Sequence, residues 1–270
     1  MREQGSIIPE STADRIVTFL AEVAREARVA EVRIGLGYIA VMLAGGGTGV
    51  AFTFRDEAKG GCSIFNGVRP LSQRSAYELL VFLKSRDPIE AGVGLACANA
   101  LANREMNGYL GGDILDHLDL RSDDRVGMVG YFAPLVSAIQ SRARLLTVFE
   151  RAVHRSELLR PQEEAVDELP RCDVALFTAT AIMNHTMDAL LKASESCREV
   201  AVLGASTPLL PAAFEGKKVT LLSGVLVRNP QEILRVVSEG GGMRFFGPHV
   251  RKVSLRVSAD SRSFSTRATT

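Results

Sequence analysis

The sequence predicts an α/β protein in which a small α+β domain precedes a doubly wound parallel sheet. Three observations lead to this fold class. The 270 residues are long for one compact core and sufficient for two. The first part of the chain, about one hundred residues, has the pattern of a helix, a hairpin and a helical pair. Beyond it, short apolar runs alternate with helical patterns, and such runs without polar alternation are typical of parallel strands covered on both faces.

The N-terminal domain is expected to span residues 1–104. Its elements are predicted in this order: a helix at 12–28, a strand in the first part of 31–43, a turn at 45–49, a returning strand at 50–54, and helices at 73–85 and 90–104. The first helix carries apolar residues at helical spacing, and Ser11 or Thr12 is suited to cap it. Together these elements form a compact α+β unit.

The second domain is expected at residues 105–257, with a Gly- and acid-rich linker at 105–124 and a polar tail at 258–270. Strands are predicted at 125–129, 145–149, 173–178, 199–203 and 218–222. Helices are predicted at 134–141, 186–196, 208–214 and 230–239. This alternation of strand and helix indicates a doubly wound α/β sheet.

Composition excludes two classes of partner. Lys plus Arg number 32 and Asp plus Glu 31, so a net charge of +1 provides no basic face for nucleic acid. No apolar run is long enough to cross a bilayer, and the N-terminus lacks the apolar core of a signal peptide. We therefore expect a cytoplasmic protein that binds neither nucleic acid nor membrane. Whether it forms a homo-oligomer is left open.

Metal ligands are sparse in the sequence. The cysteines are scattered and are expected to be reduced: Cys62, Cys97, Cys172 and Cys197. The histidines form no HxxxH pair: His117, His154, His185 and His249. His185 is the best placed of them, at an expected helix start, although a lone histidine is more often structural. Ligation of a hard metal by Glu150, Asp188 or the acids of 113–124 stays open.

Four strand-to-helix junctions are candidate ligand sites, because ligands of doubly wound sheets bind at the carboxyl ends of the strands. They are residues 130–134, 178–186, 204–211 and 223–232. At the second junction Asn184 is the expected helix cap, and at the third Ser206 or Thr207 precedes Pro208 at the first helical position. At the fourth, Asn229, Pro230 and Glu232 fit a cap, a first position and a capping-box acid. Each polar residue could simply cap its own helix, but donors from four junctions converge on one sheet edge.

The first junction, within "VGMVGYFAPLV" (126–136), resembles a dinucleotide fingerprint only in part. An acid at the end of the second strand, Glu150, stands where a ribose would bind. The glycines are incomplete, since only Gly127 and Gly130 occur. Phe132 and Pro134 stand where a pyrophosphate needs close approach to the backbone.

Several stretches in this order resemble the prokaryotic heavy-metal chelation family, whose members are domain-of-unknown-function proteins. They are "GLGYIAV", "GLACANAL", "VGMVGYFAPLV", "TATAIMNHTMDALL", "GASTPLLPAAF" and "LSGVLVRNPQEILRVVSEGGGMRFF". The resemblance implies an enolase N-terminal-like domain joined to a Rossmann-like domain, with a site in the cleft between them. It covers roughly residues 10–250.

By this resemblance, residues from both domains line the cleft. They are Asn99, Gly130, Tyr131, Phe132, Pro134, Glu150, Thr178, Thr180, Asn184, Thr186, Ser206 and Thr207. The same resemblance implies the handling of a heavy-metal ion or a metal chelate, although no residue pattern identifies the metal.

Three hypotheses follow, in order of preference. In the first, the cleft binds a small ligand, such as a metal ion or metal chelate. In the second, the chain is an enzyme that uses NAD or S-adenosylmethionine, with Glu150 on the ribose. In the third, it is an assembly module whose capped helix starts are purely structural. The sequence does not decide whether any reaction is catalysed.

Overall fold

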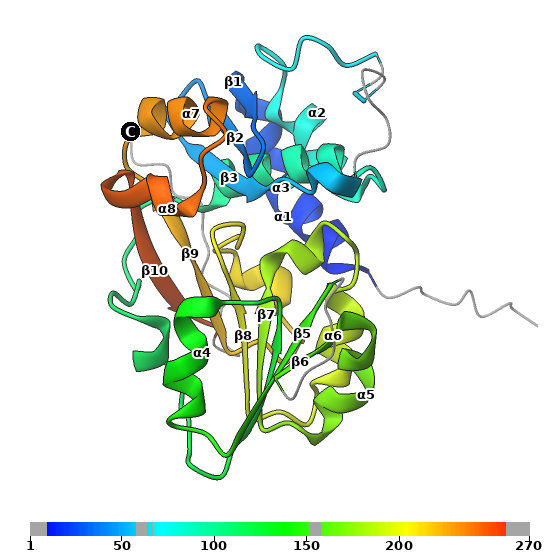
Figure 1. Ribbon diagram of the computed structural model, residues 1–270. Helices are drawn as coiled ribbons and strands as arrows, with labels where there is room; N and C mark the ends of the chain where they lie inside the picture. The colour runs from blue at the N-terminus through cyan, green and yellow to red at the C-terminus, as the bar shows by residue number, and fades with distance from the viewer. Residues whose placement is uncertain (1–9, 58–63, 66, 152–157, 258–270) are drawn as a thin grey trace, which may run out of the picture.

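The computed structural model describes residues 10–57, 64–65, 67–151 and 158–257. Within them lie a three-stranded sheet and a seven-stranded sheet, stacked one above the other with helices around both (Figure 1). The expectations for Cys62, His154 and the polar tail fall outside the described residues. No helix in the described part of the chain is long and apolar enough to cross a membrane.

The smaller sheet is antiparallel, with strand order β1-β2-β3. The elements up to residue 102 are α1 (Thr12–Glu26), β1 (Val29–Ile34), β2 (Tyr38–Leu43), β3 (Thr48–Phe52), η1 (Arg55–Glu57), α2 (Ala76–Leu80), η3 (Val81–Lys84) and α3 (Pro88–Ala102). The expected strand in 31–43 is thus two strands separated at Gly35. A Cβ atom at position 35 would lie 2.1 Å from the carbonyl oxygen of Val237, so this turn needs glycine to let a distant helix approach.

The helical pair that follows is packed tightly against the small sheet. The helix predicted at 73–85 begins only after Ser75, which forms a capping box with Glu78, and its second half is a 3-10 helix. Nearly every side chain of α3 is buried. A Cβ atom at Gly49 of β3 would lie 2.2 Å from the backbone nitrogen of Ala100, so strand and helix touch through their backbones.

The larger sheet has strand order β10-β9-β8-β7-β4-β5-β6, and every neighbouring pair is parallel except β10 with β9. Its strands are β4 (Arg125–Val129), β5 (Leu145–Glu150), β6 (Leu159–Pro161), β7 (Val174–Thr178), β8 (Glu199–Leu203), β9 (Leu221–Val227) and β10 (Val250–Arg256). The predicted mixed α/β class with a mainly parallel sheet is confirmed. The order reverses between β4 and β7, as it does in dinucleotide-binding doubly wound sheets.

Helices and 3-10 turns connect these strands. They are η4 (Ile114–Asp116), α4 (Ala133–Gln140), η5 (Gln162–Glu164), α5 (Ala165–Glu168), η6 (Leu169–Arg171), η7 (Ala179–Ile182), α6 (Met187–Ala193), η8 (Pro211–Phe214), α7 (Pro230–Ser238), α8 (Met243–Phe246) and η9 (Gly247–His249). Alternate strand residues serve two separate cores. Met128 packs with α4 on one face, whereas Val129 belongs to the large core that includes α1, α3 and α6.

Two predicted elements of the second domain are wrong in position. The strand predicted at 218–222 runs from Leu221 to Val227. It continues through Ser223 and Gly224 because both residues pair with β10. The helix predicted at 208–214 is only the 3-10 turn η8. The backbone before that turn is held instead by Asn103, whose Oδ1 accepts a hydrogen bond from the Leu209 N–H at 2.8 Å.

Helix α7 returns to the small sheet. Its residues Ile233, Leu234 and Val237 form a third core with Ala40 and Val50 of β2 and β3. Figure 1 shows this helix beside the small sheet, beyond the end of β9. A segment late in the sequence therefore covers a sheet formed by the first fifty-odd residues.

Two asparagines on α3 tie the helix to the chain after β8. The Asn99 Nδ2 group donates to the carbonyl oxygens of Val50 (2.8 Å) and Ser206 (3.0 Å). One turn later, the Asn103 Nδ2 group donates to the carbonyl oxygens of Thr207 (2.9 Å) and Val225 (3.3 Å). Both side chains are buried, so these amides replace water as partners of the backbone.

We expect Asn103→Ala to lower the free energy of unfolding by about 3 kcal/mol, because it leaves buried carbonyl and amide groups unpaired. A urea titration followed by circular dichroism measures the change. The matched control is Asn107→Ala, which removes an exposed amide. Equal stability of the two variants would contradict the role assigned to Asn103.

Candidate functional site

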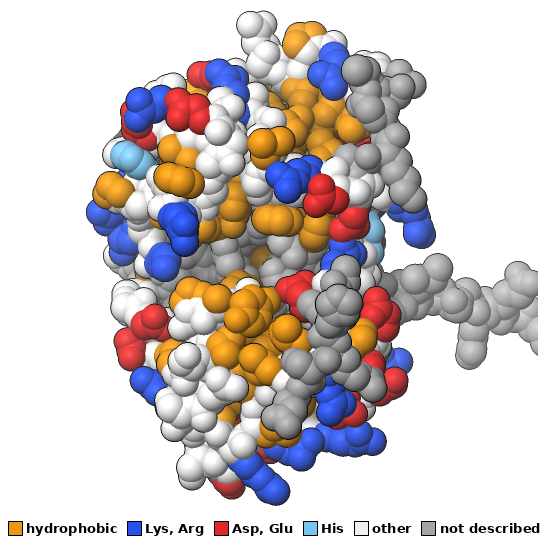
Figure 2. All heavy atoms as spheres, viewed as in Figure 1, with side chains coloured by type: hydrophobic (Ala, Val, Ile, Leu, Met, Phe, Trp, Pro, Cys, Tyr) orange, Lys and Arg blue, Asp and Glu red, His pale blue; other side chains and the backbone are white. Residues whose placement is uncertain are grey.

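A cavity of about 790 Å³ lies at the carboxyl edge of the large sheet, below the small sheet. Figure 2 shows apolar side chains gathered on both sides of a hollow across this face. The expected site residues that line the cavity are Gly130, Tyr131, Phe132, Pro134, Glu150, Thr178, Thr180, Asn184 and Ser206. Asn99, Thr186, Thr207 and His185 are not among its lining residues.

The turn after β4 is shaped by Gly130. Its φ angle is +92°, and a Cβ atom there would lie 2.9 Å from Cβ of Thr178 on the neighbouring strand. Only glycine fits this backbone conformation and this contact without strain. The ring of Phe132 then lies close to Gly204, on the far side of the same edge. An aromatic ring thus occupies space that dinucleotide sites leave to a pyrophosphate.

Glu150 holds this turn in place. One carboxylate oxygen accepts a hydrogen bond from the Tyr131 N–H at 2.7 Å, and the other accepts from the Arg151 N–H at 2.8 Å. Each oxygen is therefore already bonded to a backbone amide. The sequence predicted that this carboxylate would bind a ribose. In the structure it links the end of β5 to the turn after β4.

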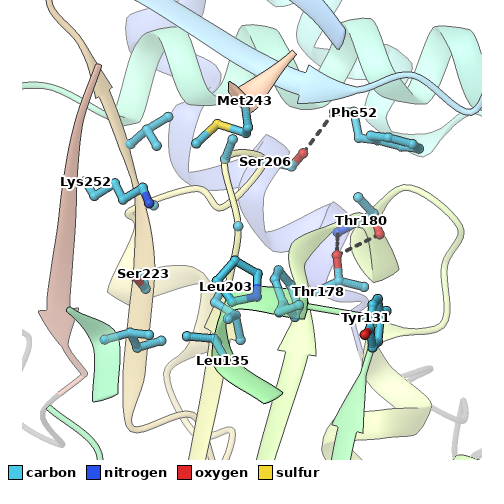
Figure 3. A pocket seen from close by; sticks show the side chains of 18 of the residues that line it. Phe52, Tyr131, Leu135, Thr178, Thr180, Leu203, Ser206, Ser223, Met243 and Lys252 are labelled. Atoms are coloured by element: carbon cyan, nitrogen blue, oxygen red, sulfur yellow. Dashed lines mark hydrogen bonds between the residues drawn. The ribbon is translucent and has the colours of Figure 1, made fainter. Parts of the chain in front are cut away.

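The second junction is a network of short-range polar contacts. The hydroxyl groups of Thr178 and Thr180 lie 2.9 Å apart, and the Thr180 N–H donates to Thr178 (Figure 3). Asn184 Oδ1 accepts from the N–H and the hydroxyl group of Thr186, at 3.2 and 2.7 Å. The N-cap residue of α6 is Thr186, so the expected cap at Asn184 is two residues early.

The third and fourth junctions differ from the predicted caps. Ser206 does not cap a helix; its hydroxyl oxygen accepts from the Phe52 N–H at 2.9 Å and so joins the two walls of the cavity. Thr207 is fully buried, and its carbonyl oxygen bonds to Asn103. Asn229 precedes α7 but makes no side-chain capping bond, and Glu232 pairs with Arg235 instead of closing a capping box.

Sequence reasoning missed the aromatic wall of the cavity. Tyr38 of β2 and Phe52 of β3 are directly opposite in the strand register, and their rings meet edge to face, with centroids 5.9 Å apart and planes at 87°. Phe54 continues the row at 5.3 Å, and Phe246 of α8 extends it at its other end, 5.0 Å from Tyr38. Burial raises the pKa of Tyr38 to about 12. The aromatic residues at 52 and 54 were a visible signal, since their spacing places both on one strand face.

Charged residues stand at opposite ends of the cavity. Arg151 pairs with Glu57, and its guanidinium carbon lies 5.0 Å from the ring centre of Phe54. Lys252 lines the other end, on β10, a strand that was not predicted. Figure 3 shows its amino group directed toward the interior, with Met243 above it and Ser223 below.

The described residues do not fit a directly bound heavy metal. No group of three His, Cys, Asp or Glu side chains within the described ranges could hold an ion. His185 lies outside the cavity lining, with Nε2 2.9 Å from the Ser85 carbonyl oxygen. Asp188 instead accepts from the N–H and hydroxyl groups of Thr12, and Asp113 caps η4. The three described cysteines, Cys97, Cys172 and Cys197, are free thiols, and burial raises the pKa of each.

Three proteins are similar to this chain at low sequence identity, one by sequence and two by structure. An uncharacterized protein of Methanocaldococcus jannaschii is 23% identical over 261 residues, covering 93% of this chain and 98% of the relative. The crystal structure of a Pyrococcus horikoshii protein of unknown function matches with a TM-score of 0.80 and 23% identity. The match covers 91% of this chain and 100% of the P. horikoshii chain. The crystal structure of a Desulfitobacterium hafniense protein, also of unknown function, has a TM-score of 0.78 and 22% identity, covering 90% and 97%.

Two family models match successive parts of the chain, at residues 17–102 and 113–256. Both carry the same description, "Putative heavy-metal chelation". The second alone covers more than half of the chain, and the crystal structures from P. horikoshii and D. hafniense come from the family of that model. The chain therefore belongs to the family whose two models carry this description.

Proposed function

We propose that the chain binds a small, flat metal chelate in the cavity between the two sheets, and that the metal arrives inside its organic ligands. The aromatic row of Tyr38, Phe52 and Phe54 carries this proposal. A cavity of about 790 Å³ is of the size that small-molecule sites commonly have. The description of the family supports a metal-related ligand.

The donor set favours a chelate over a bare ion. A heavy-metal ion needs several soft or charged ligands that converge on one point. The described residues offer no such group, and each oxygen of the Glu150 carboxylate already accepts one hydrogen bond from a backbone amide. A chelate brings its own ligand atoms and presents a flat apolar surface to the protein, so it requires only shape and a few polar contacts.

The exposed rings supply the binding surface. Phe52 is 38% exposed and Tyr131 is 50% exposed, although both line the cavity. Large apolar side chains left open in a concave site gain free energy when a ligand covers them. Phe52 ends β3 of the small sheet and Tyr131 lies in the turn after β4 of the large sheet, so a flat ligand can contact both walls.

We expect a planar chelate, the square-planar bis(maleonitriledithiolate) complex of nickel(II), to bind saturably, with isothermal titration calorimetry as the measurement. The planar bipyridine–ethylenediamine complex of platinum(II) is the second probe. Phe52→Ala should weaken that binding about tenfold, because it removes one stacking surface. Phe19→Ala is the matched control, since Phe19 is 48% exposed on α1 and does not line the cavity. Free nickel ion should bind less tightly than either complex.

The proposal fails if neither complex binds the unmodified protein, or if Phe52→Ala and Phe19→Ala bind them equally well. Thermal melting of both variants verifies that each is folded. Tighter binding of free nickel ion than of either complex would also contradict the proposal, because it would require a ligand set supplied by the protein.

A nucleotide-type cofactor is the second candidate function. The strand order and the place of Glu150 at the end of the second parallel strand favour it, since an acid there binds ribose hydroxyls in dinucleotide sites. The turn after β4 opposes it, because Phe132 fills the edge and the Tyr131 N–H is already bonded.

We expect neither NAD nor S-adenosylmethionine to bind saturably in a calorimetric titration. Glu150→Ala should instead destabilise the protein by about 1 kcal/mol, because two partly exposed backbone amides lose their acceptor. Glu22→Ala, which removes an exposed carboxylate on α1, is the control. Saturable cofactor binding that disappears in Glu150→Ala would favour the nucleotide function over the chelate.

A further inference from the structure

We propose that the ligand of the cavity is an anion and that Lys252 recognises its negative charge. This inference rests on the proposed chelate-binding function and adds the charge and the orientation of the ligand. It is carried by the position of Lys252, by the state of the other charged lining residues and by the separation of charges along the sheet edge.

The strand register places Lys252 on the cavity side of β10. Lys252 is the partner of Val225 on β9, and Ser254 is the partner of Ser223, with their hydroxyl oxygens 3.1 Å apart. Paired residues of neighbouring strands point to the same face. Ser223 and Val225 line the cavity, so the face that carries Lys252 is the cavity face, as Figure 3 shows.

The other cation of the lining, Arg151, pairs with Glu57. The two lining acids accept hydrogen bonds from backbone amides: Glu150 from Tyr131 and Arg151, and Asp113 from Leu115. Among the residues that the structure describes, no acid pairs with Lys252. An ammonium group without a counter-charge beside an apolar cavity attracts an anion.

One carboxylate of the lining, that of Glu150, is distant from Lys252. Glu150 ends β5, which lies five strand positions from β10 in the sheet. At about 4.8 Å per step the two strands are about 24 Å apart, beyond the screening length of physiological salt. Lys252 thus places an ammonium group at the β10 end of the cavity, and the exposed rings lie toward the other end. We therefore expect the anionic group to bind near Lys252 and the flat body near Phe52.

A lysine on an edge strand can also serve to discourage pairing with another chain. Over part of β10, another segment of the chain already protects this edge. The Leu110 N–H donates to the Ser254 carbonyl oxygen at 2.8 Å, and the Ser254 N–H donates back at 2.9 Å. Because the segment before η4 covers this edge two residues from Lys252, edge protection does not account for an amino group that points inward.

The test compares two square-planar metal chelates of opposite charge. The bis(maleonitriledithiolate) complex of nickel(II) carries two negative charges, and the bipyridine–ethylenediamine complex of platinum(II) carries two positive charges. We expect the full-length protein to bind the anionic complex more tightly. Lys252→Gln should weaken binding of that complex about tenfold, and Lys252→Arg should retain most of it. The control is Lys192→Gln, which removes an exposed lysine on α6 outside the cavity.

The outcomes separate this inference from the proposed function. If both complexes bind equally well and Lys252→Gln changes neither, the chelate function stands and the role of Lys252 is overturned. If neither complex binds, the proposed function itself fails. Weaker binding of the anionic complex at higher salt in the unmodified protein, with a smaller salt effect in Lys252→Gln, supports the charge contact.

Discussion

The contact between α3 and the chain after β8 is the constraint on which the rest of the structure depends. Asn99 bonds at once to β3 and to Ser206, and so one buried amide joins a helix, a strand of the small sheet and a loop of the large sheet. Buried amides are costly to leave unpaired, so these bonds fix the position of the loop. The loop in turn presents the Ser206 hydroxyl to the Phe52 N–H. The two walls of the cavity are thus held at one separation by backbone contacts.

The return of α7 makes this arrangement harder to open. If the two sheets were joined only through the segment at 105–124, the cavity between them could widen by rotation about a single crossing. Instead Val237 packs against the small sheet, and Gly35 lets its carbonyl group approach the β1–β2 turn. The chain therefore crosses between the sheets a second time, in a segment that precedes α8 and the cavity residue Met243. Such double attachment favours a site that is formed before its ligand arrives.

The parts of the fold that depend on local pattern were predictable. Strands β4 and β8 have the predicted bounds, because each is a short apolar run buried on both faces of a parallel sheet. The edge strand β10 was missed, since its lysine, arginine and serine residues break that pattern and only pairing with β9 makes it a strand. The helix expected after Pro208 failed for a similar reason. A proline after a serine and a threonine has the local signal of a helix start, but Asn103, 106 positions away, bonds the backbone there in another conformation.

Part of the candidate site was likewise predictable from local pattern and part was not, and the part that was missed determines which ligand fits. The strand-end rule located Gly130, Glu150 and Thr178 at the cavity, because the carboxyl ends of parallel strands share one edge. It could not reveal the aromatic row, which exists only because β2 pairs with β3 and α8 folds back upon them. Yet that row changes which ligand the carboxyl edge of the sheet is suited to bind. In a dinucleotide site the free amides after the first strand bind phosphate, whereas here the Tyr131 N–H is bonded to Glu150 and Phe132 fills the turn. An edge with its phosphate donors occupied and aromatic rings above it is better suited to a flat surface than to a phosphate chain.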